Sequence, residues 1–138
     1  MQFDWKYFLQ VAKELIQKAD SQDKGTNDNI IQAYLRTSIS RTYYAIFNIV
    51  KEIYENRIAK LKCRKSNVHM ILIHSLTESN EDFERKVGEL LNNIRKMRNI
   101  SDYCKENSEI PTIKLLKRQA QRCIDNSILI MQELERLR

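Results

Sequence analysis

Arg98, Asn99 and Asp102 stand within one short polar segment, and side chains of these types could bind an anion. Arg98 and Asp102 are four residues apart, so on a helix they can form an ion pair. The carboxylate would then orient the guanidinium, and Asn99 would add hydrogen bonds to the anion. The alternative is an intrahelical salt bridge at the edge of a helix bundle, which contributes only about 0.3–0.5 kcal/mol to stability.

Arg41 and Tyr44 form a second pair that could bind a nucleic acid. They are three residues apart, so on a helix they lie on the same face. A guanidinium beside an aromatic ring can hold a phosphate while the ring stacks on a base. The alternative is an aromatic residue of the core beside an arginine whose charged end reaches the solvent.

The positive charge of the chain is concentrated in one region. The 138 residues include 24 lysines and arginines and 18 aspartates and glutamates, giving a net charge of +6. Residues 29–65 account for the whole excess and contain a basic run with Arg57, Lys60, Lys62 and Arg64. Such a patch suits a phosphate-bearing partner, and the alternative is a solvated helix end that keeps the protein soluble.

The sequence lacks the patterns that metal or nucleotide-cofactor chemistry needs. Its two histidines, His69 and His74, are five residues apart, a spacing that does not place two metal ligands on one helix face. Its two glycines, Gly25 and Gly88, are far apart, so there is no glycine-rich phosphate loop. The three cysteines show no C-x-x-C spacing and are expected to be reduced thiols. We therefore expect no metal and no cofactor.

Neither a targeting segment nor a membrane span is expected. Charged residues such as Asp4, Lys6 and Lys13 occur early in the chain, unlike in a signal peptide or anchor. No stretch approaches the roughly 18 apolar residues of a membrane helix. We expect a cytoplasmic protein.

Apolar residues recur at helical spacing along most of the chain and predict five helices. The expected helices cover residues 3–19, 28 to about 60, 67 to about 77, 81 to between 103 and 107, and 111 or 112 to the C-terminus. With one proline and two glycines, the chain is too poor in turn residues for a sheet of many short strands. The predicted fold is therefore all-α, an antiparallel up-down bundle of four to five helices in a single domain, residues 1–138.

The second predicted helix is apolar on more than one side, so it should be central in the bundle. Its first half nevertheless carries Arg36, Ser40 and Arg41. Polar groups on a central helix need partners, because an unpaired buried charge is very costly. This half of the helix is a candidate functional face.

Taken together, these segments resemble the HEPN (higher eukaryotes and prokaryotes nucleotide-binding) superfamily. The resemblance rests on a long second helix that reads Ser-x-x-Arg-x-Tyr-Tyr-Ala-x-Phe, a histidine early in a short helix, and a fourth helix that ends Arg-Asn-x-x-Asp-Tyr. The matching residues, spread over roughly residues 3–135, are Ser38, Arg41, Tyr43, Tyr44, Ala45, Phe47, His69, Arg98, Asn99, Asp102 and Tyr103.

The resemblance implies a helical bundle that pairs with a second copy through its fourth-helix motifs. It also implies a role for many members as metal-independent ribonucleases in toxin–antitoxin, antiviral and RNA-processing systems. Stand-alone members are often encoded beside a minimal nucleotidyltransferase that acts as their antitoxin. In the ribonuclease motif, an arginine is followed after four to six residues by a histidine, and the arginine would be Arg98.

Here the sequence departs from that motif, because no histidine follows His74. Tyr103 stands where the histidine could have been, and a tyrosine with a pKa of about 10 is a poor base at neutral pH. His69 and His74 are possible substitutes, and the alternative is that one packs on the bundle while the other is exposed. We therefore give nuclease activity less weight than binding.

The resulting hypothesis is a HEPN-type homodimer that binds RNA or a nucleotide. The site would be lined by Arg41, Tyr44, Arg95, Arg98, Asn99, Asp102 and Tyr103. If the chain cleaves RNA, Arg98 would stabilise the phosphorane and Tyr103 would transfer the proton, with His69 assisting. The alternative hypothesis is a non-catalytic module that docks a partner such as a minimal nucleotidyltransferase.

Overall fold

A computed structural model describes residues 3–23, 25–56, 67–103 and 112–137, and this part of the chain is helical and without strands. No described helix combines the length and the apolar character needed to cross a membrane. The predicted all-α class is confirmed. The helices are α1 (Lys6–Asp20), α2 (Asp28–Ile53), α4 (Val68–Thr77), α5 (Asp82–Tyr103) and α6 (Ile113–Leu134), followed by the 3-10 turn η1 (Glu135–Leu137).

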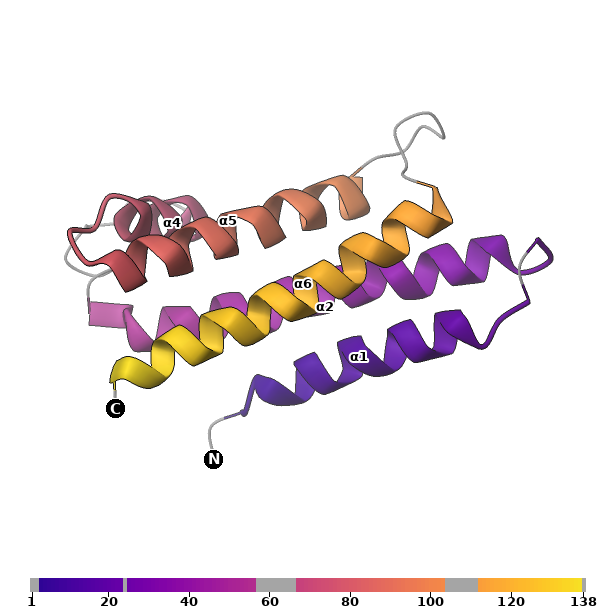
Figure 1. The fold of residues 1–138 in the computed structure, drawn as a ribbon, viewed down its shortest axis with the longest axis horizontal. Coiled ribbons are helices and arrows are strands. Elements are labelled where there is room, and N and C mark those ends of the chain that lie inside the picture. Colours follow the sequence, from indigo (N-terminus) through magenta and orange to yellow (C-terminus); the bar gives the residue numbers. More distant parts are fainter. Residues whose placement is uncertain (1–2, 24, 57–66, 104–111, 138) are drawn as a thin grey trace.

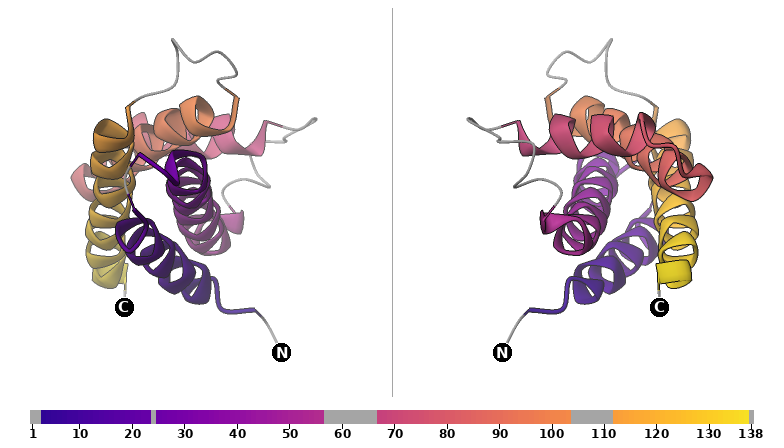
Figure 2. Two further views of the ribbon diagram at one scale, coloured as in Figure 1. Left: turned by 90° about the vertical axis from the view of Figure 1, so that its right-hand side faces the viewer. Right: turned by 90° about the vertical axis from the view of Figure 1, so that its left-hand side faces the viewer.

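Four long helices form an antiparallel bundle. In Figure 1, α1 and α5 run in one direction, and α2 and α6 run in the other. The short helix α4 is seen nearly end-on in Figure 1 and side-on in Figure 2, so it crosses the bundle axis close to the start of α5. This is the predicted up-down arrangement, to which α4 adds a short helix that lies across the four long ones.

Helix α2 is the central element, as its apolar pattern predicts. It packs against α1, α5 and α6, which surround it in the end-on views of Figure 2. Leu35, Ile39, Ile46 and Val50 are fully buried along it. The helix was expected to continue to about residue 60, but it ends at Ile53, because Tyr54 departs from the helical conformation. Residues 55 and 56 are helical again, and residues 57–60 lie outside the described part of the chain.

Side-chain caps are present at the beginning of α4 and of α6. The side chain of Asn67 accepts a hydrogen bond from the Met70 backbone N–H at 3.4 Å. Thr112 does the same for the N–H of Leu115 at 3.3 Å. Each cap satisfies one backbone donor that the first helical turn leaves without an intrahelical partner.

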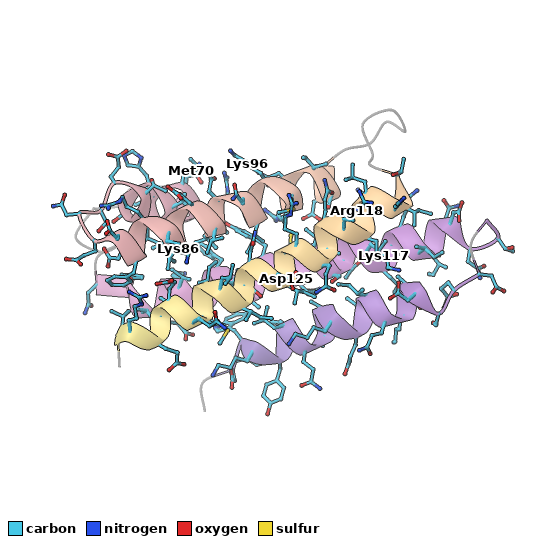
Figure 3. All side chains as sticks on the ribbon, in the orientation of Figure 1. Met70, Lys86, Lys96, Lys117, Arg118 and Asp125 are labelled. Carbon is cyan, nitrogen blue, oxygen red and sulfur yellow. The ribbon has the colours of Figure 1, made fainter. Side chains whose placement is uncertain are left out.

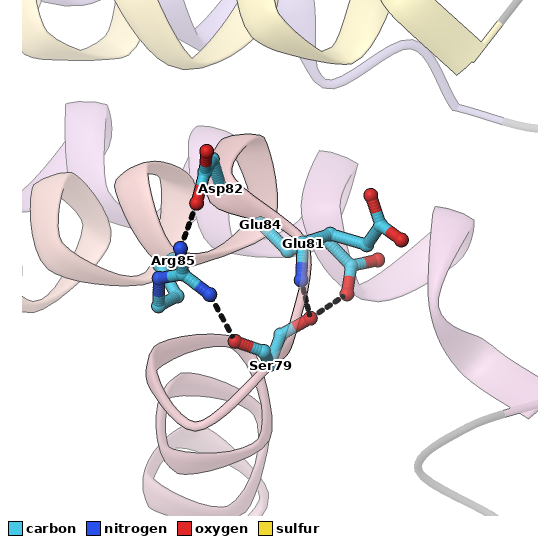
Figure 4. A network of polar contacts seen from close by, with 5 residues as sticks. All are labelled: Ser79, Glu81, Asp82, Glu84 and Arg85. Atoms are coloured by element: carbon cyan, nitrogen blue, oxygen red, sulfur yellow. Dashed lines mark hydrogen bonds and ion pairs between the residues drawn. The ribbon is translucent and has the colours of Figure 1, made fainter.

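A polar network fixes the beginning of α5 (Figure 4). Ser79 donates its hydroxyl to Glu84 at 2.6 Å and accepts the backbone N–H of Glu81 at 3.1 Å. Arg85 donates to the Ser79 carbonyl oxygen at 2.7 Å and pairs with Asp82. The acidic side chains lie in the first turn, where the helix dipole favours negative charge. The network ties the connection from α4 to the first turn of α5.

Helices α4 and α5 approach closely at Gly88. A Cβ atom at this position would lie 2.8 Å from the backbone nitrogen of Thr77 and 2.9 Å from the Cβ of Leu76. Only glycine therefore allows this separation of the two helices. The contact fixes α4 against α5, and thereby sets where the side chains of α4 meet those of α5.

Replacing Gly88 with alanine should destabilise the protein, although alanine favours the helix. The added methyl group would press on the backbone of α4, and overpacking costs about 1–3 kcal/mol, more than the gain of about 1 kcal/mol in helix propensity. Urea unfolding should show a lower midpoint for Gly88→Ala. The neighbouring exposed substitution Glu89→Ala is the control. A stabilised Gly88→Ala variant would contradict the close packing.

Candidate functional site

A pocket of about 490 Å³ lies between the first half of α2 and the end of α5. The residues from α2 occur at three- and four-residue steps, which places them on one helix face. The lining residues are Ala33, Arg36, Thr37, Ser40, Arg41 and Tyr44 from α2, with Arg98, Ser101 and Asp102 from α5. The structure thus brings together the two segments that the sequence singled out.

Arg98 and Asp102 form the predicted ion pair at the pocket wall. The Nε of Arg98 lies 2.8 Å from Oδ2 of Asp102, and their side chains are 22% and 26% exposed. Ser40 donates its hydroxyl to the same carboxylate oxygen at 3.4 Å. The partial burial makes this pair stronger than a fully solvated one, and it holds the guanidinium in one orientation.

Arg36 enters the pocket from α2 and ties α2 to the end of α5. Its Nε donates a hydrogen bond to the backbone carbonyl oxygen of Ser101. This carbonyl belongs to the last turn of α5, where carbonyl groups have no intrahelical partner and the helix dipole favours a cation. The sequence marked Arg36 only as a polar residue on a central helix, so its role at this site was missed.

Arg41 and Tyr44 form the rim of the pocket on the side of α1. The guanidinium carbon of Arg41 lies 5.4 Å from the ring centroid of Phe8, a cation–π contact. Tyr44 is 46% exposed, and its ring lies 6.3 Å from that of Trp5. Both residues share the exposed face that the sequence predicted, and Tyr44 is accessible to a planar ligand.

A second cluster lies on the other side of Arg98 and includes a histidine. The hydroxyl of Tyr43, a fully buried residue of α2, lies 2.6 Å from Nδ1 of His69 on α4. The imidazole stacks on Phe47 with ring centroids 3.9 Å apart. The guanidinium carbon of Arg98 lies 5.7 Å from the centroid of the Tyr43 ring. Arg98 therefore borders both the pocket and the histidine cluster.

Of the two histidines, His69 packs on the bundle, whereas His74 is exposed. That is the arrangement the sequence analysis gave as the alternative to a functional histidine. The packing nevertheless places His69 where the charges of Arg95 and Arg98 on α5 act on it. The family resemblance, in which His69 is a matching residue, had already pointed to this position.

Arg95 belongs to the histidine cluster and does not line the pocket. Its Nη1 donates to the sulfur of Met70 on α4 at 2.9 Å. Its Nε is buried and has no hydrogen-bond partner among the described residues. Asn99 is half-buried on α5 and does not line the pocket either. Of the residues expected to form one site, four line the pocket, Arg95 belongs to the histidine cluster, and Asn99 lies in neither; the four are Arg41, Tyr44, Arg98 and Asp102.

Burial and the two arginines set the protonation of the cluster. Burial raises the pKa of Tyr43 to about 12, against the opposing effect of Arg95 and Arg98. Burial also lowers the pKa of His69, and the positive charges of Arg95, Arg98 and Lys51 lower it further. Both groups are therefore neutral at pH 7. The 2.6 Å contact therefore joins a phenol hydroxyl to a neutral imidazole, and the tautomer of His69 decides which of the two groups donates the proton.

Several expected site residues lie outside the described part of the chain. These are the basic-run residues Arg57, Lys60, Lys62 and Arg64, and the side chain of Tyr103. Among the described residues, no three His, Cys, Asp or Glu side chains gather as metal ligands would.

The lowered pKa of His69 should make the protein less stable in acid. The unfolded chain binds the proton near pH 6.5, whereas the folded chain binds it only at lower pH. The free energy of unfolding should therefore fall as the pH drops from about 6.5 towards the lowered pKa. Urea titrations between pH 7.5 and 5 should show this loss in the wild type and in His74→Gln, and a smaller loss in His69→Gln. Equal slopes in the two variants would contradict the assignment.

The chain was compared with protein families, curated proteins and solved structures. No curated protein and no solved structure matches it. The family model of the HEPN domain matches residues 12–137, a range that includes both clusters. The match covers most of the chain and agrees with the resemblance and with the helical bundle. The chain belongs to the HEPN domain family.

Proposed function

We propose that this chain binds the phosphate groups of RNA or of a nucleotide in the pocket between α2 and α5. One observation carries the proposal: Arg36, Arg41 and Arg98 reach a single pocket from two helices, and among the described residues Asp102 is the only carboxylate that lines it. Because that carboxylate is already paired with Arg98, the pocket keeps an excess of positive charge. Membership of a family that often binds nucleotides or cleaves RNA agrees with this chemistry.

The other lining residues suit the remaining parts of a nucleotide. Thr37 and Ser40 offer hydroxyl groups beside the guanidiniums. The ring of Tyr44 is nearly half exposed and can stack on a base. Arginine suits a phosphate better than lysine here, because its planar fork can donate two parallel hydrogen bonds.

A second candidate function is metal-independent cleavage of RNA, and the contact between His69 and Tyr43 favours it. In such a reaction a base removes the proton of the ribose 2′-hydroxyl, and the 2′-oxygen attacks the phosphorus. The bond from phosphorus to the 5′-oxygen then breaks, and the leaving oxygen takes up a proton. Arg98 would stabilise the added negative charge. Tyr103 or His69 would transfer the proton, and His69 has an imidazole beside two guanidiniums.

The alternative function is the docking of a partner protein such as a minimal nucleotidyltransferase. The observation on its side is that Asp102 already engages the Nε of Arg98. We also propose that the chain acts in a toxin–antitoxin or antiviral system. This part of the proposal rests on family membership alone.

A homodimer is also part of the proposal. The family resemblance implies an interface at the motifs of the helix labelled α5. A clear exposed apolar stripe lies on the N-terminal side, where Phe3, Tyr7 and Val11 recur at four-residue steps and are 51%, 63% and 41% exposed. Such a stripe offers a second copy an apolar surface to cover.

Replacing Arg98 with alanine tests the binding function. The loss of a charge-assisted hydrogen bond to phosphate should weaken RNA binding by about ten- to a hundredfold, whereas stability should fall by about 1 kcal/mol or less. Arg98→Lys should also bind weakly, because an ammonium cannot replace the fork. Fluorescence anisotropy with a labelled RNA measures this. Arg136→Ala, which removes an exposed arginine paired with Glu133, is the control.

If Arg98→Ala binds RNA as tightly as the wild type and is only less stable, the Arg98–Asp102 pair is a structural salt bridge. Failure of the wild type to bind RNA or nucleotides would favour the docking function.

Two single substitutions identify the group that transfers the proton. If His69 does so, His69→Gln should cleave RNA about a hundredfold more slowly and still bind it. If Tyr103 does so, Tyr103→Phe should show that loss instead. Cleavage of a labelled RNA in the presence of a chelator measures both rates, with His74→Gln as the matched control. Unchanged cleavage in both variants would exclude both residues.

A further inference from the structure

A groove of about 450 Å³ runs between α5 and α6, away from the site described above. It shares no residue with the pocket between α2 and α5. Figure 3 shows Lys96 on α5 and Arg118 on the neighbouring part of α6. The lining residues are Asn93, Lys96 and Met97 from α5, with Leu115, Arg118, Gln119, Arg122 and Asn126 from α6.

The charges in this groove are unbalanced. Lys96, Arg118 and Arg122 line it, and none of the described lining residues is acidic. None of the three has an ion-pair partner within the described part of the chain. Other cations of the same helices do have one, as Lys86 does with Glu133 and Lys117 does with Asp20. The groove therefore has a local positive potential that nothing in the described fold neutralises.

The spacing of the side chains makes the groove a continuous track. Arg118, Arg122 and Asn126 follow one another at four-residue steps and extend along about 12 Å of α6. Like charges four residues apart destabilise a helix by a few tenths of a kcal/mol, roughly as much as an ion pair would stabilise it. Lys96 faces this track from α5. A bound anion would remove the repulsion.

We infer that this groove binds the phosphate backbone of single-stranded RNA, as a second contact surface beyond the pocket. The choice of RNA as the ligand rests on the proposed function. The unpaired positive charges of the groove do not, because they lie outside the pocket between α2 and α5. Two of the three cations are arginines, whose planar forks match phosphate oxygens. Asn93, Gln119 and Asn126 line the same groove, and the amides of Asn93 and Asn126 can both donate to and accept from base edges.

The apolar lining fits the same ligand. Leu115 is 45% exposed and Met97 is half-buried, so both present apolar surface to the flat face of a base. An acidic peptide could use the cations as well, so competition by polyglutamate is the measurement that separates the two ligands. The groove thus fits a chain that alternates anionic and planar polar groups.

The experiment compares two triple variants that each remove three positive charges. The groove variant combines Lys96→Gln, Arg118→Gln and Arg122→Gln. The matched control combines Lys86→Gln, Lys117→Gln and Arg136→Gln, all of which are ion-paired cations. Binding of a fluorescein-labelled single-stranded RNA is measured by anisotropy from 50 to 300 mM KCl, after circular dichroism has shown that both variants are folded.

If three phosphates are bound in the groove, the slope of log affinity against log salt should become shallower by about 2 in the groove variant, because each contact to a single strand contributes about 0.7. The control should keep the wild-type slope. Equal slopes in the two variants would overturn the inference, and so would polyglutamate competing as well as polyuridylate. Arg98→Ala reports on the pocket separately. A flattened slope in the groove variant, with wild-type binding in Arg98→Ala, would support the groove and contradict the pocket.

Discussion

The buried hydroxyl of Tyr43 constrains how three helices meet. Tyr43 lies on the central helix α2 and is fully buried, so its hydroxyl needs a partner within the protein. Leaving such a group unpaired costs about 1–3 kcal/mol. It is satisfied by His69 from α4, and the positive charge of Arg95 on α5 acts on it electrostatically. This requirement, together with the close contact at Gly88, fixes α4 across the start of α5 and places an imidazole beside two guanidiniums.

The cations of α5 and α6 differ in what neutralises them, and this difference separates structural charges from candidate binding charges. Lys86 and Lys117 pair with carboxylates of other helices and thereby hold the bundle together. Arg98 pairs within its own helix and stays at a pocket wall, where the pair orients it. Arg118 and Arg122 have no such partner in the described chain. Net charge alone would not distinguish these three situations, because each adds one positive charge to the total.

The sequence could predict contacts within a helix but not contacts between helices. The Arg98–Asp102 pair and the shared face of Arg41 and Tyr44 follow from three- and four-residue spacing, which the helix geometry determines. The contact of Tyr43 with His69 joins residues 26 apart in the sequence, and that of Arg36 with Ser101 joins residues 65 apart. Such contacts depend on how helices cross, which local periodicity does not encode. For the same reason the sequence placed Arg95 in one site with Arg98 and Asp102, although the structure turns it towards α4.

If a phosphate binds against Arg98, as proposed, its binding would be coupled to proton uptake by His69. Arg95 and Arg98 lower the pKa of His69 because a proton on the imidazole would meet two positive charges. A phosphate bound against Arg98 would offset that repulsion, so the pKa of His69 would rise when the site is occupied. By linkage, protonation of His69 would then strengthen phosphate binding by the same factor. The imidazole of His69 would thus be neutral in the empty site, and its pKa would be higher when a phosphate is bound. His69 packs on Tyr43 and Phe47. This packing is structural, and it also holds the histidine where the charges of both arginines act on it.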